Sequence, residues 1–358
     1  MHLALIKGEN FRLLQRLEIE PRAKINLILG ENATGKTSLL EAIYCLGRGK
    51  SFRGNGPSEM AGQAGRSWRV TGKLLRQIDT PAMNLGVRWN TEGTGIRVGE
   101  TIKPSTADLV SAMPVQILDP GMHRLLQDGP GYRRSFLDWG VFHVEHQFLP
   151  TWRRHQRALK QRNRALRQKA SNKEIYAWNP ELAETAGLLH KFRTEHLQAL
   201  QPILHLEIAK VFGTEDWSID LYPGWSTDSS YLESLEKQVE RDRRMGTTVE
   251  GAHRAELQLR LRQHQVKNRI SRGQQKLLIA AMVLAQSRLI HKHREMAPIL
   301  LVDDFAAELA SDFQRLFASM LHRYPGQLFI TSFERLPAFE DFTDPAMFHV
   351  EHGQVCQC

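Results

Sequence analysis

The sequence predicts an α/β protein in which a mainly helical segment interrupts the sheet-forming part. Short apolar runs, typical of buried strands, lie towards both ends of the 358-residue chain, at 25–29, 299–302 and 327–331. Between them, residues 132–213 are rich in Leu, Ala, Arg, Gln and Glu and poor in turn residues, which favours helices. The strands before and after this segment are therefore expected to share one domain.

The change in composition divides the chain into three parts. It becomes helical near Pro120, and the α/β pattern returns in the last hundred residues. We expect the first part of the α/β domain in 1–120, a helical insertion in 121–255 and the second part of the domain in 256–358.

Individual elements follow from local patterns. Residues 3–6 and 17–20 are short mixed segments. Within 68–98, stretches of alternating polar and apolar residues are separated by Gly, Thr and Asn, which favours antiparallel strands. Helices are expected after Thr37 and over 152–169, 182–211, 231–244 and 274–290. Pro202 is expected to disturb the helix over 182–211.

Composition indicates the cellular compartment of the protein and the charge of its binding partner. The net charge of +9 favours an anionic partner such as nucleic acid. No apolar run reaches the roughly 18 residues needed to span a bilayer, and the first residues do not resemble a signal peptide. Three cysteines, Cys45, Cys356 and Cys358, are too few for a disulfide framework. We expect a cytoplasmic protein with no membrane association.

A phosphate-binding loop follows the strand at 25–29. Residues 30–37 match GxxxxGK[ST] in full. They lie between an expected strand and an expected helix, the context that a P-loop needs. Its glycines let backbone N–H groups approach phosphate oxygens, its lysine is expected to reach the β- and γ-phosphates of ATP, and its threonine to bind Mg²⁺. The predicted ATP-binding residues are Gly30, Glu31, Asn32, Ala33, Thr34, Gly35, Lys36, Thr37 and Ser38.

The strand at 299–302 delivers two carboxylates, Asp303 and Asp304. Asp303 is expected to hold Mg²⁺ and Asp304 to orient or activate the attacking water. Adjacent aspartates at a strand end also form turns, but a P-loop upstream favours the catalytic role for Lys36, Asp303 and Asp304.

The segment Ile270–Gln275 precedes the apolar helix and the Asp-Asp strand. It resembles the LSGGQ signature of ABC ATPases, with Arg272 in place of the first glycine. In that superfamily the signature of one subunit closes on the γ-phosphate held by another subunit. The resemblance implies nucleotide contacts from Ser271, Gly273 and Gln274, and a fold with an ABC-type P-loop ATPase head as lobe I and an inserted, mainly helical lobe II.

Segments spread over nearly the whole chain resemble the RecF family of bacterial recombination mediators. They are GENATGKTS, LGRGKSFRG, PVQILDPGMHRLLQDGPGYRRSFLDWG, ISRGQQKLL, LLVDDFAAEL and MFHVEHG. The resemblance implies an ATP-dependent homodimer without a long coiled coil that binds double-stranded DNA, including at single-strand gaps, without sequence specificity. It further implies work with RecR and RecO in recombinational repair and replication restart, recombinase loading and SOS induction.

The same resemblance assigns roles to further residues. Gln116 matches the Q-loop glutamine that contacts the metal and the γ-phosphate, so it is a predicted catalytic and Mg²⁺-binding residue. Ser332 falls where transporter ATPases carry a switch histidine, which argues against a transporter. Ala310 replaces the aspartate of the family's D-loop, and Asp304 is shorter than the usual ABC glutamate. We therefore expect slow, DNA-stimulated ATP hydrolysis.

A basic helix is the predicted DNA contact. Residues 152–169 contain eight Lys or Arg and no acid, and phosphates attract such a face. The alternative is a solvated helix paired with Glu181, Glu184 and Glu195. The predicted DNA-contacting residues are Arg153, Arg154, Arg157, Lys160, Arg162 and Arg164, and a second candidate is the loop with Arg48, Lys50 and Arg53.

The remaining motifs do not point to a further catalytic or metal site. FHVEH occurs at 142–146 and 348–352, but neither copy has a known zinc spacing. Arg133 and Arg134 are as well suited to ion pairs as to ligand contacts, and Trp139 is expected in the core. Two other functions remain open: a P-loop kinase that needs no signature serine, and a scaffold in which ATP is structural.

Overall fold

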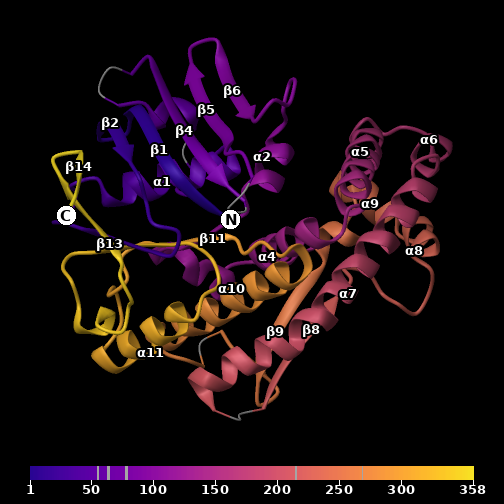
Figure 1. Cartoon of the computed structure of the whole chain (residues 1–358). Helices are drawn as coiled ribbons and strands as arrows, with labels where there is room; N and C mark the ends of the chain where they lie inside the picture. Colours follow the sequence, from indigo (N-terminus) through magenta and orange to yellow (C-terminus); the bar gives the residue numbers. More distant parts are fainter. Residues whose placement is uncertain (55, 63–64, 77–79, 214–215, 268) are drawn as a thin grey trace. The chain divides into compact units, whose positions relative to one another are not determined.

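The computed structural model describes residues 1–54, 56–62, 65–76, 80–213, 216–267 and 269–358. The chain forms two compact units, of which the first comprises Met1–Met122 and Arg272–Cys358 and the second His123–Ser271 (Figure 1). Residues 256–271, which the sequence analysis grouped with the second part of the α/β domain, belong to the second unit by this division.

A six-stranded sheet carries the P-loop in the first unit. Its strand order is β14-β13-β3-β12-β11-β7, and β13, β3, β12, β11 and β7 run parallel. The antiparallel β14 extends its edge. The strands are β3 (Ile25–Leu29), β7 (Val115–Leu118), β11 (Ile299–Val302), β12 (Leu328–Ser332), β13 (Ala346–Glu351) and β14 (Gln354–Gln357).

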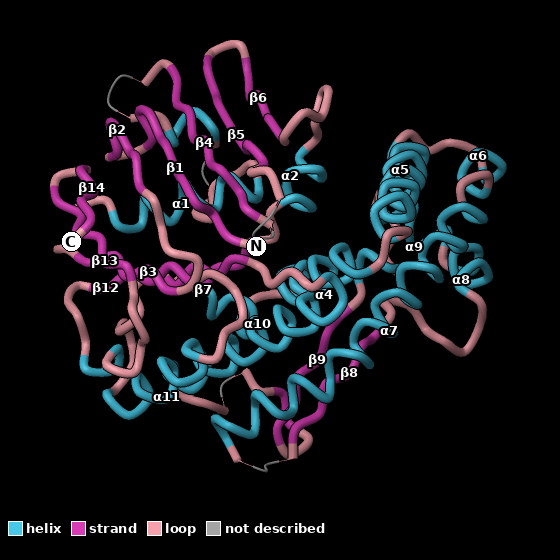
Figure 2. The backbone as a smooth tube through the Cα atoms, in the orientation of Figure 1, coloured by secondary structure: helices cyan, strands magenta, loops and turns pink. Residues whose placement is uncertain are grey.

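A second, antiparallel sheet in this unit has the order β2-β1-β4-β5-β6 (Figure 2). Its strands are β1 (His2–Phe11), β2 (Leu14–Ile19), β4 (Ser67–Leu75), β5 (Met83–Asn90) and β6 (Gly93–Val98). Helix α1 (Lys36–Arg48) contacts strands of both sheets and is buried from Ser38 to Gly47. One hydrophobic core therefore joins the two sheets through the helix that follows the P-loop.

The remaining helices of the first unit are α2 (Thr106–Ala112), α10 (Arg272–Arg294) and α11 (Ser311–His322), with short 3₁₀ turns at Pro57–Met60 and Pro337–Phe339. Helix α10 is nearly all buried between Gly273 and Ile290. The continuous apolar run at 277–285 fits this burial, because a helix segment that is apolar on every side needs neighbours on every side.

The second unit consists mainly of helices. These are α3 (Arg124–Gln127), α4 (Pro130–Val144), α5 (Phe148–Arg167), α6 (Asn172–Tyr176), α7 (Asn179–Phe212), α8 (Tyr231–Lys237) and α9 (Val239–Met245). A small antiparallel sheet that the sequence analysis did not predict has the order β10-β9-β8, formed by β8 (Trp217–Tyr222), β9 (Glu256–Leu261) and β10 (His264–Gln265).

Two helices of the second unit differ in extent or continuity from the sequence-based expectation. Helix α7 continues through Pro202 without a break over 34 residues, because proline removes one backbone hydrogen bond but packing along the rest of the helix can hold it. The helix expected over 231–244 is two helices that meet at Gln238. Over the described residues, no helix is long and apolar enough to cross a membrane.

Candidate functional site

The P-loop turns sharply between β3 and α1, and two glycines permit the turn. Gly30 has φ +149° and Gly35 has φ +119°, in the region that L side chains rarely adopt. A Cβ atom on Gly30 would lie 2.4 Å from the carbonyl oxygen of Val350 on β13. The loop is therefore packed against the β13–β14 hairpin, where Gly353 N–H also donates to the Thr34 carbonyl at 2.9 Å.

Lys36 lies at the first position of α1 and faces the loop. Its Nζ donates to the carbonyl oxygens of Gly30 and Glu31, both at 2.6 Å. Burial lowers the pKa of Lys36, while Asp304 and Asp303 oppose this shift. The lysine is thus held over the backbone cradle where a phosphate chain would lie.

Thr37, at the start of α1, and Asp303, just after β11, lie within hydrogen-bond distance of each other. The Thr37 hydroxyl donates to Asp303 Oδ1 at 3.1 Å, and the Thr331 hydroxyl on β12 donates to the same oxygen at 2.9 Å. Burial raises the pKa of Asp303, and the hydrogen bonds from Thr331 and Thr37 partly offset this effect. A hydroxyl and a carboxylate at this separation form an all-oxygen donor set, which fits Mg²⁺.

Asp304 has φ +51°, an uncommon conformation for a residue other than glycine. Its backbone N–H donates to Thr331 Oγ1 at 2.8 Å, so one threonine fixes the side chain of Asp303 and the backbone of Asp304. Both aspartates line the same cavity at the end of β11.

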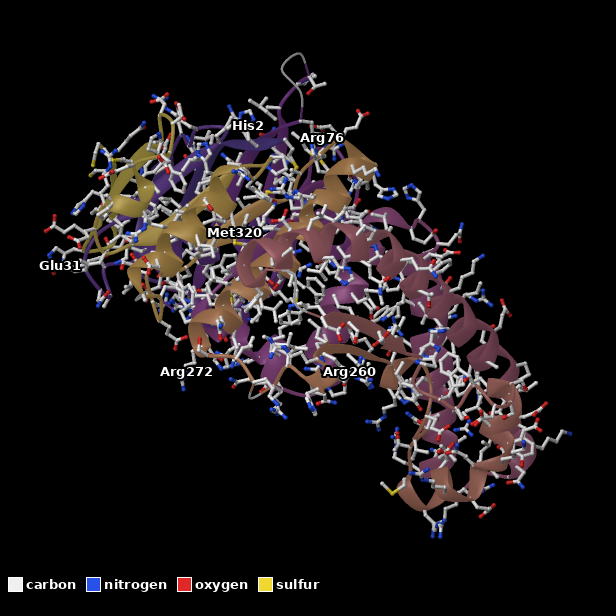
Figure 3. The ribbon with its side chains drawn as sticks, turned by 90° about the horizontal axis from the view of Figure 1, so that it is seen from below. His2, Glu31, Arg76, Arg260, Arg272 and Met320 are labelled. Atoms are coloured by element: carbon white, nitrogen blue, oxygen red, sulfur yellow. The ribbon has the colours of Figure 1, made fainter. Side chains whose placement is uncertain are left out.

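These residues share one open cavity of about 690 Å³. The cavity brings together most of the predicted P-loop residues and both aspartates with residues that were not predicted to bind ATP, among them Arg12, Thr331 and Phe333. Glu31 lies at the surface (Figure 3) and is not part of the lining. The lining residues are Arg12, Leu13, Asn32, Ala33, Gly35, Lys36, Thr37, Ser38, Arg53, Glu59, Ala61, Gly62, Asp303, Asp304, Thr331 and Phe333.

A buried carboxylate on α1 organises two arginines at this cavity. Glu41 is fully buried and accepts from Arg12 Nε at 3.0 Å and Arg12 Nη2 at 2.7 Å. It also accepts from the Ser51 hydroxyl at 2.5 Å, and Arg53 lies 3.9 Å away. The sequence offered a signal for this arrangement, because Glu41 lies among apolar residues in the helix after the P-loop. A buried carboxylate requires a cationic partner.

The prediction for Gln116 is corrected by the structure. Gln116 lies in the middle of β7, paired with Leu300 in the interior of β11 rather than with the aspartates that follow that strand. Its Nε2 donates to Gln286 Oε1 on α10 at 2.9 Å, and it does not line the cavity. The glutamine therefore links β7 to α10 and is not placed to bind Mg²⁺ or a γ-phosphate.

The signature residues lie at the beginning of α10. Ser271 is exposed just before the helix, Arg272 is its first residue and Gly273 is buried. Arg272 extends into solvent (Figure 3) and forms an ion pair with Glu308 at 3.3 Å. Gly273 and Gln274 do not line the P-loop cavity of their own chain. An exposed helix N-terminus carries partial positive charge, so it can bind an anion supplied from outside.

Helix α5 separates its basic residues into an exposed set and a buried one. With about 100° between successive helix positions, the exposed Arg153, Arg157, Lys160 and Arg164 share an arc of about 60°. Among the described residues, none of these four has a carboxylate within ion-pair distance. We call these four residues the α5 stripe.

Arg162 was wrongly predicted to contact DNA. It is fully buried on the opposite side of α5, where its Nη1 forms an ion pair with Asp242 at 2.6 Å and also donates to Thr248. Its role is to join α5 to α9. Arg154 is exposed, but it is bound by Glu181 and Glu184 at 2.8 and 3.1 Å.

The remaining motifs have structural partners. Arg133 forms an ion pair with Glu256 at 2.6 Å, and Trp139 is buried against His143 at 4.5 Å between ring centroids. His349 and His352 belong to the β13–β14 hairpin that supports the P-loop. The part of the chain that the structure describes contains no group of three or more His, Cys, Asp or Glu arranged to hold a metal ion.

Known proteins resemble this chain in sequence over its full length. Residues 6–94 match a family model described as an AAA domain. The DNA replication and repair protein RecF of Cellvibrio japonicus is 36% identical and covers 99% of each chain. The protein of the same name from Chromohalobacter salexigens is 38% identical, again over 99% of each chain.

Solved structures share the fold. That of the recombination mediator protein RecF with ATP, in the RecFOR pathway, superposes with a TM-score of 0.88 at 23% identity, covering 100% of this chain and 97% of the other. An Smc head bound to the C-terminal winged-helix domain of ScpA gives a TM-score of 0.61 at 14% identity, covering 100% and 98%. The predicted fold class, an ABC-type ATPase head with an inserted helical lobe in place of a long coiled coil, is confirmed. With relatives more than 30% identical over nearly all of its length, the chain belongs to the RecF family of DNA replication and repair proteins.

Proposed function

We propose that this protein is an ATP-driven homodimeric DNA clamp of recombinational repair and replication restart, which hydrolyses ATP slowly to reset itself. The observation that carries this proposal is the convergence of the P-loop with the Asp-Asp strand. Lys36, Thr37, Asp303 and Asp304 come from two distant segments and line one open cavity. Membership in the RecF family supports the assignment to repair.

The residues divide the chemistry between them. Backbone N–H groups of 30–37 and the Lys36 ammonium would hold the phosphates, since both face the same cradle. Thr37 and Asp303 would hold Mg²⁺, which neutralises charge on the phosphates when bound. Asp304 would orient the attacking water, because its carboxylate lines the cavity beside Asp303. The shorter reach of aspartate supports slow turnover.

Two subunits would complete each site. The cavity of one chain is open and is not lined by that chain's Gly273 or Gln274, while Ser271 is exposed before α10. A second copy can present this helix N-terminus to a γ-phosphate held by Lys36. ATP would then join the two subunits at two equivalent sites, and hydrolysis would separate them.

The α5 stripe is our candidate for DNA contact, together with the loop of Arg48, Lys50 and Arg53. Cationic side chains on one helix face suit the phosphate backbone of duplex DNA and carry no sequence information. Binding beside a single-strand gap, stimulation of hydrolysis by DNA, cooperation with RecR and RecO, and a role in the SOS response extend the proposal by family membership.

The test is binding of a fluorescent gapped duplex at fixed salt, with ATP and then with ADP. We expect tighter binding with ATP, and loss of that difference in Lys36→Ala and Ser271→Arg. Lys24→Ala, the same change at an exposed lysine of the first unit, serves as the control and should behave as wild type.

The two other functions predict different results. Equal DNA binding with ATP and ADP would contradict the clamp and favour a scaffold with structural ATP. A P-loop kinase would bind no DNA in either nucleotide, and Ser271→Arg would leave its activity intact.

A further inference from the structure

Lys276 is a buried cation one helical turn after the signature. It lies on α10, is almost completely buried, with 6% of the residue exposed, and does not line the P-loop cavity. Its Nζ donates to three backbone carbonyls, those of Asp304 and Phe305 at 3.1 Å and of Ala307 at 2.9 Å. An ammonium has three donors, so all of them are used.

The three carbonyls belong to the turn that carries Asp304. This turn leaves β11 at Asp303 and continues through residues 304–310 to α11, and two of its residues, Asp304 and Glu308, have positive φ. On its other side the turn is held by Thr331, whose hydroxyl accepts from Asp304 N–H and whose carbonyl accepts from Phe305 N–H. Lys276 and Thr331 therefore hold an uncommon backbone conformation from two sides.

Lys276 links this turn to the helix that carries the signature, and the ion pair between Arg272 and Glu308 is a second, exposed link between the same two segments. Gly273 and Lys276 are three residues apart on α10, whose backbone hydrogen bonds make this segment rigid. A displacement at the start of α10 must consequently move Nζ relative to the turn or carry the turn with it. Burial lowers the pKa of Lys276 to about 8, so the amine keeps its third donor at neutral pH.

We propose that Lys276 is a positioning residue that couples the signature segment of a subunit to the Asp304 turn of the same subunit. The inference rests on the proposed ATP-bridged dimer. There, Ser271 and Gly273 would meet the nucleotide of the partner, while Asp304 serves the nucleotide of its own P-loop. Lys276 thus connects the two ATP sites: engagement of one is transmitted to the catalytic turn of the other.

The test compares Lys276→Met with Lys292→Met in the full-length protein. Both remove a lysine ammonium from α10, but Lys292 is exposed near the end of the helix. Nucleotide affinity, ATP-driven dimerisation, steady-state hydrolysis and thermal melting are measured for each. In Lys276→Met we expect ATP binding and dimerisation to persist while kcat falls roughly 10- to 100-fold, the cost of a small misplacement of a catalytic group. The Hill coefficient for ATP should fall to about 1, since the coupling between sites is removed.

Three outcomes would overturn the coupling role. These are wild-type turnover in Lys276→Met, parallel losses of ATP binding, dimerisation and turnover together with a lower melting temperature, or equal effects of Lys292→Met.

Where the methionine variant does not fold, Lys276→Arg, which keeps a cation with enough donors, takes its place. It must then dimerise with ATP and retain cooperative turnover, and loss of cooperativity despite those donors would also overturn the role. A failure of the clamp itself is distinguishable, because it appears as wild-type protein that neither dimerises nor hydrolyses ATP.

Discussion

A Cβ atom on Gly30 would meet the carbonyl oxygen of Val350 at 2.4 Å, and the residue has φ +149°. Gly30→Ala should therefore combine backbone strain with a backbone clash and distort the loop that holds Lys36. Gly93 has a similar φ of +138° with nothing within 4 Å of such a Cβ. We expect Gly93→Ala to show the strain alone, of about 1–3 kcal/mol, and to keep ATP affinity.

The comparison is made by urea unfolding and by titration with a fluorescent ATP analogue. Gly30→Ala should lose more stability than Gly93→Ala and should also lose ATP affinity. If the two variants are equally stable and both bind ATP normally, the β13–β14 hairpin does not constrain the P-loop.

Helix α5 separates DNA contact from structural support within one basic segment. Arg157 is in the α5 stripe, whereas Arg154 is turned away from it and bound by Glu181 and Glu184. Arg157→Ala should weaken binding of duplex DNA regardless of sequence and reduce the slope of log affinity against log salt by about 1, as for the loss of one phosphate contact. Arg154→Ala is the matched control, and fluorescence anisotropy at several salt concentrations is the measurement. A larger effect of Arg154→Ala would place the DNA elsewhere.

Elements whose information is local were predictable from the sequence. The P-loop, the strand at 299–302 and the helices around 152–169 and 274–290 each depend on a pattern within a few turns of chain, and the structure has them there. The hairpin β13–β14 could not be placed by such reasoning. It supports the P-loop from more than 300 residues away, through contacts of Val350 and Gly353 that no local pattern encodes.

The candidate site shows the same limit at single residues. Lys36, Thr37 and Asp303 were predicted, because their spacing follows the chemistry of phosphate and Mg²⁺. Gln116 was misplaced, since strand register decides which side chain reaches the sheet edge and one sequence does not reveal register. Arg162 was misassigned because charge alone does not distinguish an exposed arginine from one that joins two helices.

The second unit encloses several histidines, and this gives the chain a predictable response to acid. His155 is buried and His253 half-buried, with their ring centroids 6.3 Å apart, beside Thr185 and the Thr248 carbonyl. Burial lowers the pKa of His155 to about 3 and that of His253 to about 4, and nearby charged residues such as Arg193 and Arg254 add to these shifts.

Below a pH of about 6.5 the unfolded chain therefore binds protons that the folded chain excludes. The stabilising effect of the neutral rings is complete above that pH and is lost as pH falls towards the folded pKa values, with a slope of about 1.4 kcal/mol per pH unit for each histidine. Urea unfolding followed by tryptophan fluorescence, to which Trp225 in this unit's core contributes, should show the loss between about pH 6.5 and 4.5. His253→Gln should flatten this dependence, whereas His291→Gln, at an exposed position of α10, should not. An unchanged slope in His253→Gln would mean that other groups take up the protons on unfolding.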